Sequence, residues 1–172
     1  MDEASIQRIK LAHPSIRAKL LQDYTDANNL LGKGARLRLA YVYRTVEEQN
    51  KLFNQRPKVT NAKGGQSIHN YGLAFDIVIL YDNNGDGKFE EASWSMIRDF
   101  DKDSKADWME VTNLFKSRGW ENGGDWKKFK DYPHFQMRKD NWSSYTWKEL
   151  KALVDSGKII RDSNVVYPKL QM

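Results

Sequence analysis

The 172-residue chain contains no cysteine. A disulfide framework and a thiolate metal site are therefore excluded, and a bound transition metal would have to use His, Asp or Glu side chains. The four prolines, Pro14, Pro57, Pro133 and Pro168, are too scattered to mark a linker between domains. We therefore expect a single domain over residues 1–172.

Long apolar stretches are also missing. No segment approaches the roughly 18 consecutive apolar residues that a membrane span needs, and the acidic N-terminus does not resemble a signal peptide. We expect no membrane span and synthesis in the cytoplasm. Apolar residues nevertheless make up 40% of the chain and aromatic residues 12%, which is typical of a folded globular protein.

The charged residues form no block of one sign. Lys and Arg number 28 against 23 Asp and Glu, which gives a net charge of +5 and a pI near 9.3. This excess predicts attraction to a polyanion, and nucleic acid, anionic membranes and anionic cell-wall polymers all qualify. Because no basic tail is present, only the net charge supports a nucleic-acid-binding domain, and a charge this small is also ordinary for solubility.

The hydrophobic pattern predicts an α+β fold. Four segments have helical spacing, caps or both, and three alternate as strands do or are continuously apolar. The helices are expected over residues 14–31, 45–53, 104–118 and 146–156, and the strands over residues 36–43, 73–81 and 132–137. Short strands separated by helices in this order favour a small, mainly antiparallel sheet with flanking helices.

One ionisable residue, Asp76, interrupts the apolar strand over residues 73–81. A buried aspartate costs several kcal/mol unless it is paired. A metal shared with His69 and His134 would pair it, and so would an arginine from a neighbouring strand: Arg36, Arg38 or Arg44. The residues alone leave both alternatives open.

Two histidines and one carboxylate would leave a fourth tetrahedral position for water, which is the pattern of a catalytic zinc ion. Zinc lowers the pKa of bound water to roughly 7 and polarises a peptide carbonyl. A nearby carboxylate must then move protons, and Asp131 is three residues before His134.

Three blocks of residues extend this pattern between residues 37 and 137. They are Tyr43-Arg44-Thr45 with Gln49; Ser67-x-His69-x-x-Gly72-x-Ala74-x-Asp76; and Gly123-Gly124-Asp125-Trp126 followed by Asp131-Tyr132-Pro133-His134-Phe135. These blocks resemble the zinc metallopeptidases that include L-alanyl-D-glutamate endopeptidases and D-alanyl-D-alanine carboxypeptidases of bacteria and phages. The resemblance implies the fold of D-alanyl-D-alanine peptidases and hedgehog-like domains, with the zinc site on the sheet.

The resemblance also implies roles for individual residues. His69, Asp76 and His134 would bind zinc, and Asp131 would be the general base. Arg44, with Gln49, would bind substrate or stabilise the developing oxyanion, and Ser67 would contact substrate or orient His69. Two alternatives remain open: Arg44 could pair with Asp76, and Gln49 could lie on a solvated helix face.

A second motif, Asp82-x-Asn84-x-Asp86-Gly87, matches the start of a calcium-binding loop. Its twelfth position, Ser93, lacks the bidentate glutamate of an EF-hand, so a plain hairpin loop is the alternative.

An aspartate at position 131 resembles the endopeptidase branch. We therefore expect hydrolysis of the L-Ala–D-Glu bond of the peptidoglycan stem peptide by a monomer that also contacts anionic wall polymers and binds no nucleic acid. The alternatives are a D-alanyl-D-alanine carboxypeptidase and a non-catalytic, zinc-containing wall-binding module. Without a signal peptide, such an enzyme would reach the wall through cell lysis or a phage holin, as endolysins do.

Overall fold

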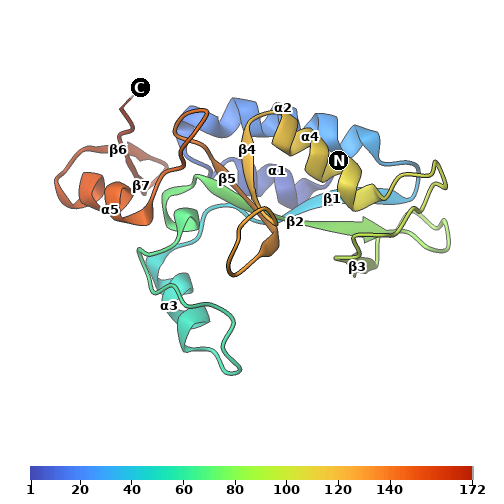
Figure 1. Cartoon of the computed structure of the whole chain (residues 1–172), viewed down its shortest axis with the longest axis horizontal. Helices are drawn as coiled ribbons and strands as arrows, with labels where there is room; N and C mark the ends of the chain where they lie inside the picture. Colours follow the sequence, from blue (N-terminus) through green and yellow to red (C-terminus); the bar gives the residue numbers. More distant parts are fainter. Residues whose placement is uncertain (172) are drawn as a thin grey trace.

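The computed structural model describes residues 1–171, and it has the expected α+β architecture (Figure 1). Its main sheet has the path β1–β2–β5–β4, and β3 pairs with β2 beyond that path. All of these pairings are antiparallel. The strands of this sheet are β1 (Ala35–Tyr41), β2 (Ala74–Tyr81), β3 (Glu91–Ser93), β4 (Trp120–Gly123) and β5 (Asp131–Met137).

Helices lie on both sides of this sheet. Figure 1 shows α1 (Glu3–Ile9), α2 (Arg17–Leu30) and α4 (Asp107–Ser117) together on one side, and α3 (Val46–Asn54) projecting on the other. The remaining elements are the 3-10 turns η1 (Pro14–Ile16) and η2 (Ile68–Tyr71), the helix α5 (Trp147–Asp155) and the hairpin of β6 (Ile159–Asp162) and β7 (Val165–Pro168). No helix among the described residues is long and apolar enough to cross a membrane.

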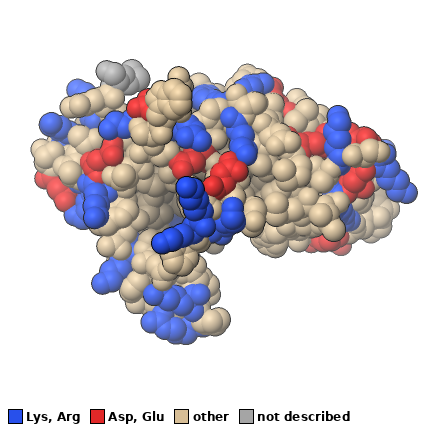
Figure 2. All heavy atoms as spheres, in the orientation of Figure 1, with Lys and Arg blue, Asp and Glu red and all other residues tan. Residues whose placement is uncertain are grey.

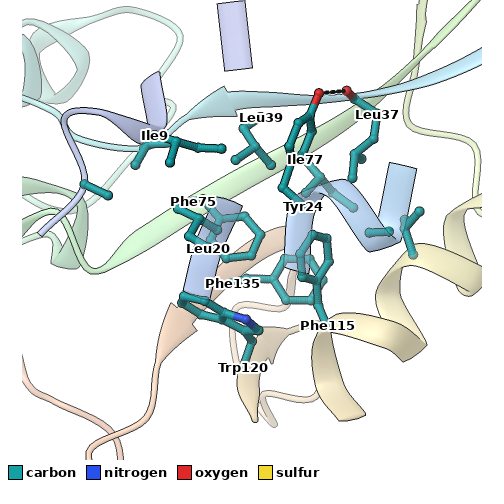
Figure 3. Packing of buried hydrophobic residues seen from close by; sticks show 14 of the residues in the cluster. Ile9, Leu20, Tyr24, Leu37, Leu39, Phe75, Ile77, Phe115, Trp120 and Phe135 are labelled. Atoms are coloured by element: carbon teal, nitrogen blue, oxygen red, sulfur yellow. Dashed lines mark hydrogen bonds between the residues drawn. The ribbon is translucent and has the colours of Figure 1, made fainter. Parts of the chain in front are cut away.

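The hydrophobic core fills the space between the sheet and the group of α1, α2 and α4 (Figure 3). Alternate side chains of β1 and β2, such as Leu37 and Ile77, meet Leu20 of α2 and Phe115 of α4 there. The Tyr24 hydroxyl donates a hydrogen bond of 3.0 Å to the Leu37 carbonyl oxygen, which satisfies a polar group inside this core. Since one face of the sheet is covered in this way, the other face is available for a site.

Several elements differ from their predicted bounds or were not predicted. The first helix, α1, the short strands β3 and β4 and the final hairpin carry too few periodic residues to be recognised from sequence. The helix predicted from residue 104 begins at Asp107, with Ala106 as its N-cap and no capping side chain. Ser104 is not a cap because its backbone is left-handed, with φ of 75°. The helices predicted from residues 45 and 146 are present, and each begins with a capping box, at Thr45 and at Thr146.

Candidate metal centre

Two of the predicted ligands lie directly opposite each other in the sheet. Asp76 of β2 pairs with His134 of β5 in the antiparallel ladder. The adjacent pair, Phe75 and Phe135, is fully buried, and its rings stack with centroids 5.2 Å apart. Because side chains alternate along a strand, burial of the two phenylalanines directs Asp76 and His134 to the opposite face.

His69 approaches the same point from η2. The Ser67 hydroxyl caps this turn by accepting a hydrogen bond from the His69 backbone N–H at 3.3 Å. The His69 Nδ1 atom lies 2.8 Å from the Val42 carbonyl oxygen, which can only accept a hydrogen bond. Nδ1 therefore carries a proton, and Nε2 points at Asp76 Oδ1, 3.2 Å away.

Gly72 fixes how η2 joins β2. Its φ is 71°, its carbonyl accepts the His13 N–H at 2.8 Å, and an added Cβ would lie 2.6 Å from that nitrogen. We expect Gly72→Ala to destabilise the fold by about 2–4 kcal/mol, through backbone strain and the clash together. Urea unfolding would measure the loss.

Gly157→Ala is the matched control for this substitution. Gly157 has a similar φ of 78°, but an added Cβ would meet nothing within 4 Å. We expect it to cost only about 1 kcal/mol, the strain of a left-handed alanine. Equal losses in the two variants would show that the contact of Gly72 with His13 is unimportant.

His134 is held by a chain of polar contacts that sequence reasoning missed. Its Nδ1 lies 3.2 Å from Asp76 Oδ1, while Nε2 lies 2.9 Å from Gln136 Oε1. The Gln136 amide donates to Glu121 at 3.2 Å, and Glu121 also accepts from Trp126 Nε1 at 2.8 Å. The one sequence signal for this support was the placement of Gln136 two residues after His134, on the same strand face.

The electrostatics of the cluster favour a cation. Burial alone would raise the pKa of Asp76, but His69 and His134 outweigh burial and hold this pKa well below its ordinary value. Burial would lower the pKa of His134, yet the Asp76 carboxylate raises it. Ligand atoms of the three residues lie within 4.8 Å of one another, and two imidazoles with one carboxylate are a donor set that zinc accepts. The residues therefore fit a zinc ion.

Arg44 also faces this cluster. Its Nη2 lies 3.8 Å from Asp76 Oδ2, so the ion pair considered as an alternative to a metal is present beside the histidines. Nη1 donates to Gln49 Oε1 at 2.9 Å, and the Gln49 amide donates to the Ala62 carbonyl at 2.8 Å. Gln49 is only 1% exposed, so the alternative that placed it on a solvated helix face is wrong.

The other two arginines considered as partners of Asp76 are engaged elsewhere. Arg38 forms an ion pair of 2.7 Å with Asp2. The Arg36 guanidinium lies 3.9 Å from the centroid of the Phe89 ring. Of the three, Arg44 is the one that the fold brings to Asp76.

Asp131 begins β5 at the edge of the same site. An added Cβ at Gly123 would lie 2.3 Å from the Asp131 carbonyl oxygen, so the glycine lets β4 approach this close. Crowding by protein around the Asp131 carboxyl raises its pKa, and the negative charge of Asp76 raises it further. A raised pKa makes a carboxylate a stronger base.

The predicted residues surround one cleft. It has a volume of about 650 Å³ and lies on the sheet face opposite α2 and α4, beside α3 and the loop that follows it. Except for the buried Gln49, all residues predicted for chemistry or substrate contact line it: Arg44, Ser67, His69, Asp76, Asp131 and His134. A cleft of this size accommodates an extended peptide segment.

The calcium loop predicted at Asp82, Asn84 and Asp86 is a hydrogen-bonded turn. Both Asp82 carboxylate oxygens accept backbone N–H groups, with Gly85 at 2.9 Å and Gly87 at 2.8 Å. Within the described residues, this loop has no group of three metal-ligating side chains close enough to share an ion. The structure therefore lends the predicted site no support.

Three comparisons with known proteins agree with the motifs. Residues 60–137 match the family model described as D-alanyl-D-alanine carboxypeptidase. Over 110 residues the chain is 43% identical to the peptidoglycan L-alanyl-D-glutamate endopeptidase CwlK of Bacillus subtilis, an alignment that covers 61% of this chain and 62% of CwlK. The chain thus spans less than two thirds of that relative's length.

The fold has a counterpart among solved structures. The crystal structure of the Serratia marcescens L-Ala D-Glu endopeptidase ChiX superposes with a TM-score of 0.54, at 18% identity, over 80% of this chain and 88% of ChiX. This likeness concerns the fold, whereas the family match over residues 60–137 includes the His69, Asp76 and His134 segments. Residues 60–137 are thus similar to the family that the D-alanyl-D-alanine carboxypeptidase model describes, and a 110-residue part of the chain is similar to CwlK.

Proposed function

We propose that this protein is a zinc-dependent peptidase that hydrolyses the L-Ala–D-Glu bond of the peptidoglycan stem peptide. The observation that carries the proposal is the convergence of His69, Asp76 and His134 in a cleft that also contains a free carboxylate, Asp131. The 43% identity to a protein named for this same bond supports the choice of substrate.

A divalent metal at the cluster would supply Lewis acidity and lower the pKa of a water molecule. His69 Nε2, an Asp76 carboxylate oxygen and His134 Nδ1 would hold it, since the other ring nitrogens face Val42 and Gln136. The Val42 carbonyl and the Gln136 amide thereby keep the two ligand nitrogens aimed inward.

The chain's own groups then move the protons. Asp131 accepts a proton from the water molecule as the water oxygen adds to the scissile carbonyl carbon. Asp131 then gives this proton to the amide nitrogen as the C–N bond breaks. The products are a carboxylate on alanine and a free amine on glutamate. Arg44 faces the same cleft and stabilises the negative charge that develops on the carbonyl oxygen.

Positive charge near the cleft suits an anionic polymer. Lysines and arginines gather over the lobe formed by α3 and its following loop (Figure 2). Four exposed residues of this segment are Lys51, Arg56, Lys58 and Lys63. We propose that this lobe holds the enzyme on the wall while the cleft engages a stem peptide.

Digestion of purified peptidoglycan tests the bond assignment. Mass spectrometry should reveal stem peptides with a new N-terminal D-glutamate and glycan strands that keep only L-alanine. Release of free D-alanine without internal cleavage would instead identify a D-alanyl-D-alanine carboxypeptidase, which is the activity named in the description of the matched family model. The Asp131→Asn protein, prepared identically, controls for contaminating hydrolases.

A further inference from the structure

A second group of acidic residues lies far from the cleft, in the segment that connects β3 to α4 and in the first turn of α4 (Figure 1). Numbering from Asp99, carboxylates occupy positions 1, 3, 5, 9 and 12 of a twelve-residue segment: Asp99, Asp101, Asp103, Asp107 and Glu110. An EF-hand loop places its side-chain ligands at these positions, uses a backbone carbonyl at position 7 and ends with a glutamate at position 12.

The loop is already folded around its acidic side chains. The Asp103 N–H donates to Asp99 Oδ1 and to Asp101 Oδ1, each at 3.1 Å, and the Ser104 N–H donates to Asp99 Oδ2 at 2.9 Å. Ser104 occupies position 6, where an EF-hand has an invariant glycine, and its φ of 75° is the conformation that such a glycine would adopt.

Independent evidence for a ligand comes from buried oxygens that have no partner. Asp107 is fully buried, and its Oδ1 atom has no hydrogen-bond partner among residues 1–171, whereas Oδ2 accepts from the Tyr81 hydroxyl at 2.6 Å. Glu110 Oε2 is likewise buried without a partner. A buried carboxylate oxygen without a partner has lost its hydration with nothing in exchange, so such atoms call for a cation.

Three of the five carboxylates lie close enough to share one ion. Ligand oxygens of Asp99, Asp101 and Asp107 lie within 4.8 Å of one another. Lys105 provides only weak neutralisation, because its Nζ is 4.0 Å from Asp103 Oδ2 and its side chain is 70% exposed. Burial raises the pKa of Glu110, and the negative charges of Asp103 and Asp101 raise it further.

We propose that this segment binds a calcium ion through the five carboxylates and the carbonyl oxygen of Lys105. Oxygen ligands at this number and spacing are those of a hard divalent cation. This site is distinct from the hydrogen-bonded turn at Asp82, and it is independent of the proposed peptidase chemistry because no residue of it lines the cleft.

The ion would stabilise the fold. An added Cβ at Gly32 would meet Asp101 Oδ2 at 2.5 Å, and one at Gly34 would meet the Phe100 ring at 2.6 Å, so the loop packs tightly on the turn between α2 and β1. Asp107 accepts a hydrogen bond from the hydroxyl of Tyr81, the last residue of β2. Asp76 lies near the other end of the same strand. Calcium would therefore fix the end of β2 that is remote from the metal centre.

Thermal unfolding of the zinc-loaded full chain, with and without calcium chloride, tests the site. Calcium at about 100 times its dissociation constant should raise the Tm by roughly 5–10 °C. Glu110→Gln should abolish this shift, and it should raise the Tm of the calcium-free protein because it removes one of several crowded negative charges. Asp86→Asn, in the loop that begins at Asp82, is the matched control and should keep the full calcium shift.

The direction in which Glu110→Gln changes the Tm of the calcium-free protein distinguishes a calcium site from acids that only stabilise the start of α4. If the acids only complement the positive end of α4, the substitution lowers the Tm by the same amount with and without calcium, and the proposal fails. It also fails if calcium leaves the wild-type Tm unchanged, or if Asp86→Asn removes the shift and Glu110→Gln does not. Should Glu110→Gln not fold, Asp103→Asn replaces it, with loss of the calcium shift expected.

Discussion

His69→Ala is expected to abolish stoichiometric zinc binding and to lower peptidoglycan hydrolysis by about 1,000-fold or more. The substitution removes one of the three donors that lie within 4.8 Å of one another. Two protein ligands hold zinc far more weakly than three, and the Lewis acidity that the ion supplies is worth several kcal/mol in the transition state. Metal analysis of dialysed protein and the initial rate of muropeptide release would measure the two effects.

A third histidine provides the matched control. His13 is 1% exposed, and its Nε2 lies 2.7 Å from the Pro168 carbonyl oxygen, outside the cleft. His13→Gln removes a buried imidazole as His69→Ala does, but we expect it to keep one zinc per chain and most of the activity while losing stability. If His69→Ala also kept its zinc and its activity, the assigned metal centre would be wrong.

The clustering of His69, Asp76 and His134 could be predicted because short segments of the sequence indicate it. An aspartate in an apolar strand requires a partner, and that requirement is visible without any tertiary information. The motif around His69 further specifies a turn, because only a residue such as Gly72 readily adopts a φ of 71°. The α+β class followed from the periodicity of β1 and α4, together with the continuously apolar sequence of β2.

The support around the triad was hidden because it depends on pairings between distant strands. Glu121 faces Gln136 only through the register of β4 and β5, and nothing in the spacing of these two residues reveals that register. Val42 orients His69 through a backbone carbonyl, a group that every residue possesses. The acidic loop before α4 was hidden in another way, because Ser104 stands where the calcium-loop pattern requires glycine.

Asp131→Asn is expected to lower the rate of hydrolysis by about 100- to 10,000-fold, the usual range for loss of a general base, while zinc content stays at the wild-type level. The amide has nearly the shape of the carboxylate but cannot accept the proton from water. Crowding by protein and the charge of Asp76 raise the pKa of Asp131, which strengthens it as a base. Activity and zinc content should therefore separate in this variant, whereas they fall together in His69→Ala.

Asp125→Asn tests whether activity depends on the position of Asp131 or merely on the number of negative charges near the start of β5. Asp125 is another carboxylate near the start of β5, but its side chain is 54% exposed and is paired with Lys116 at 2.8 Å, outside the cleft lining. An exposed ion pair contributes little, so we expect wild-type activity and zinc content from this variant.

Full activity in Asp131→Asn would require another proton acceptor. Loss of zinc in Asp131→Asn would instead make Asp131 part of the metal centre, because a general base can be neutralised without releasing the ion that it serves.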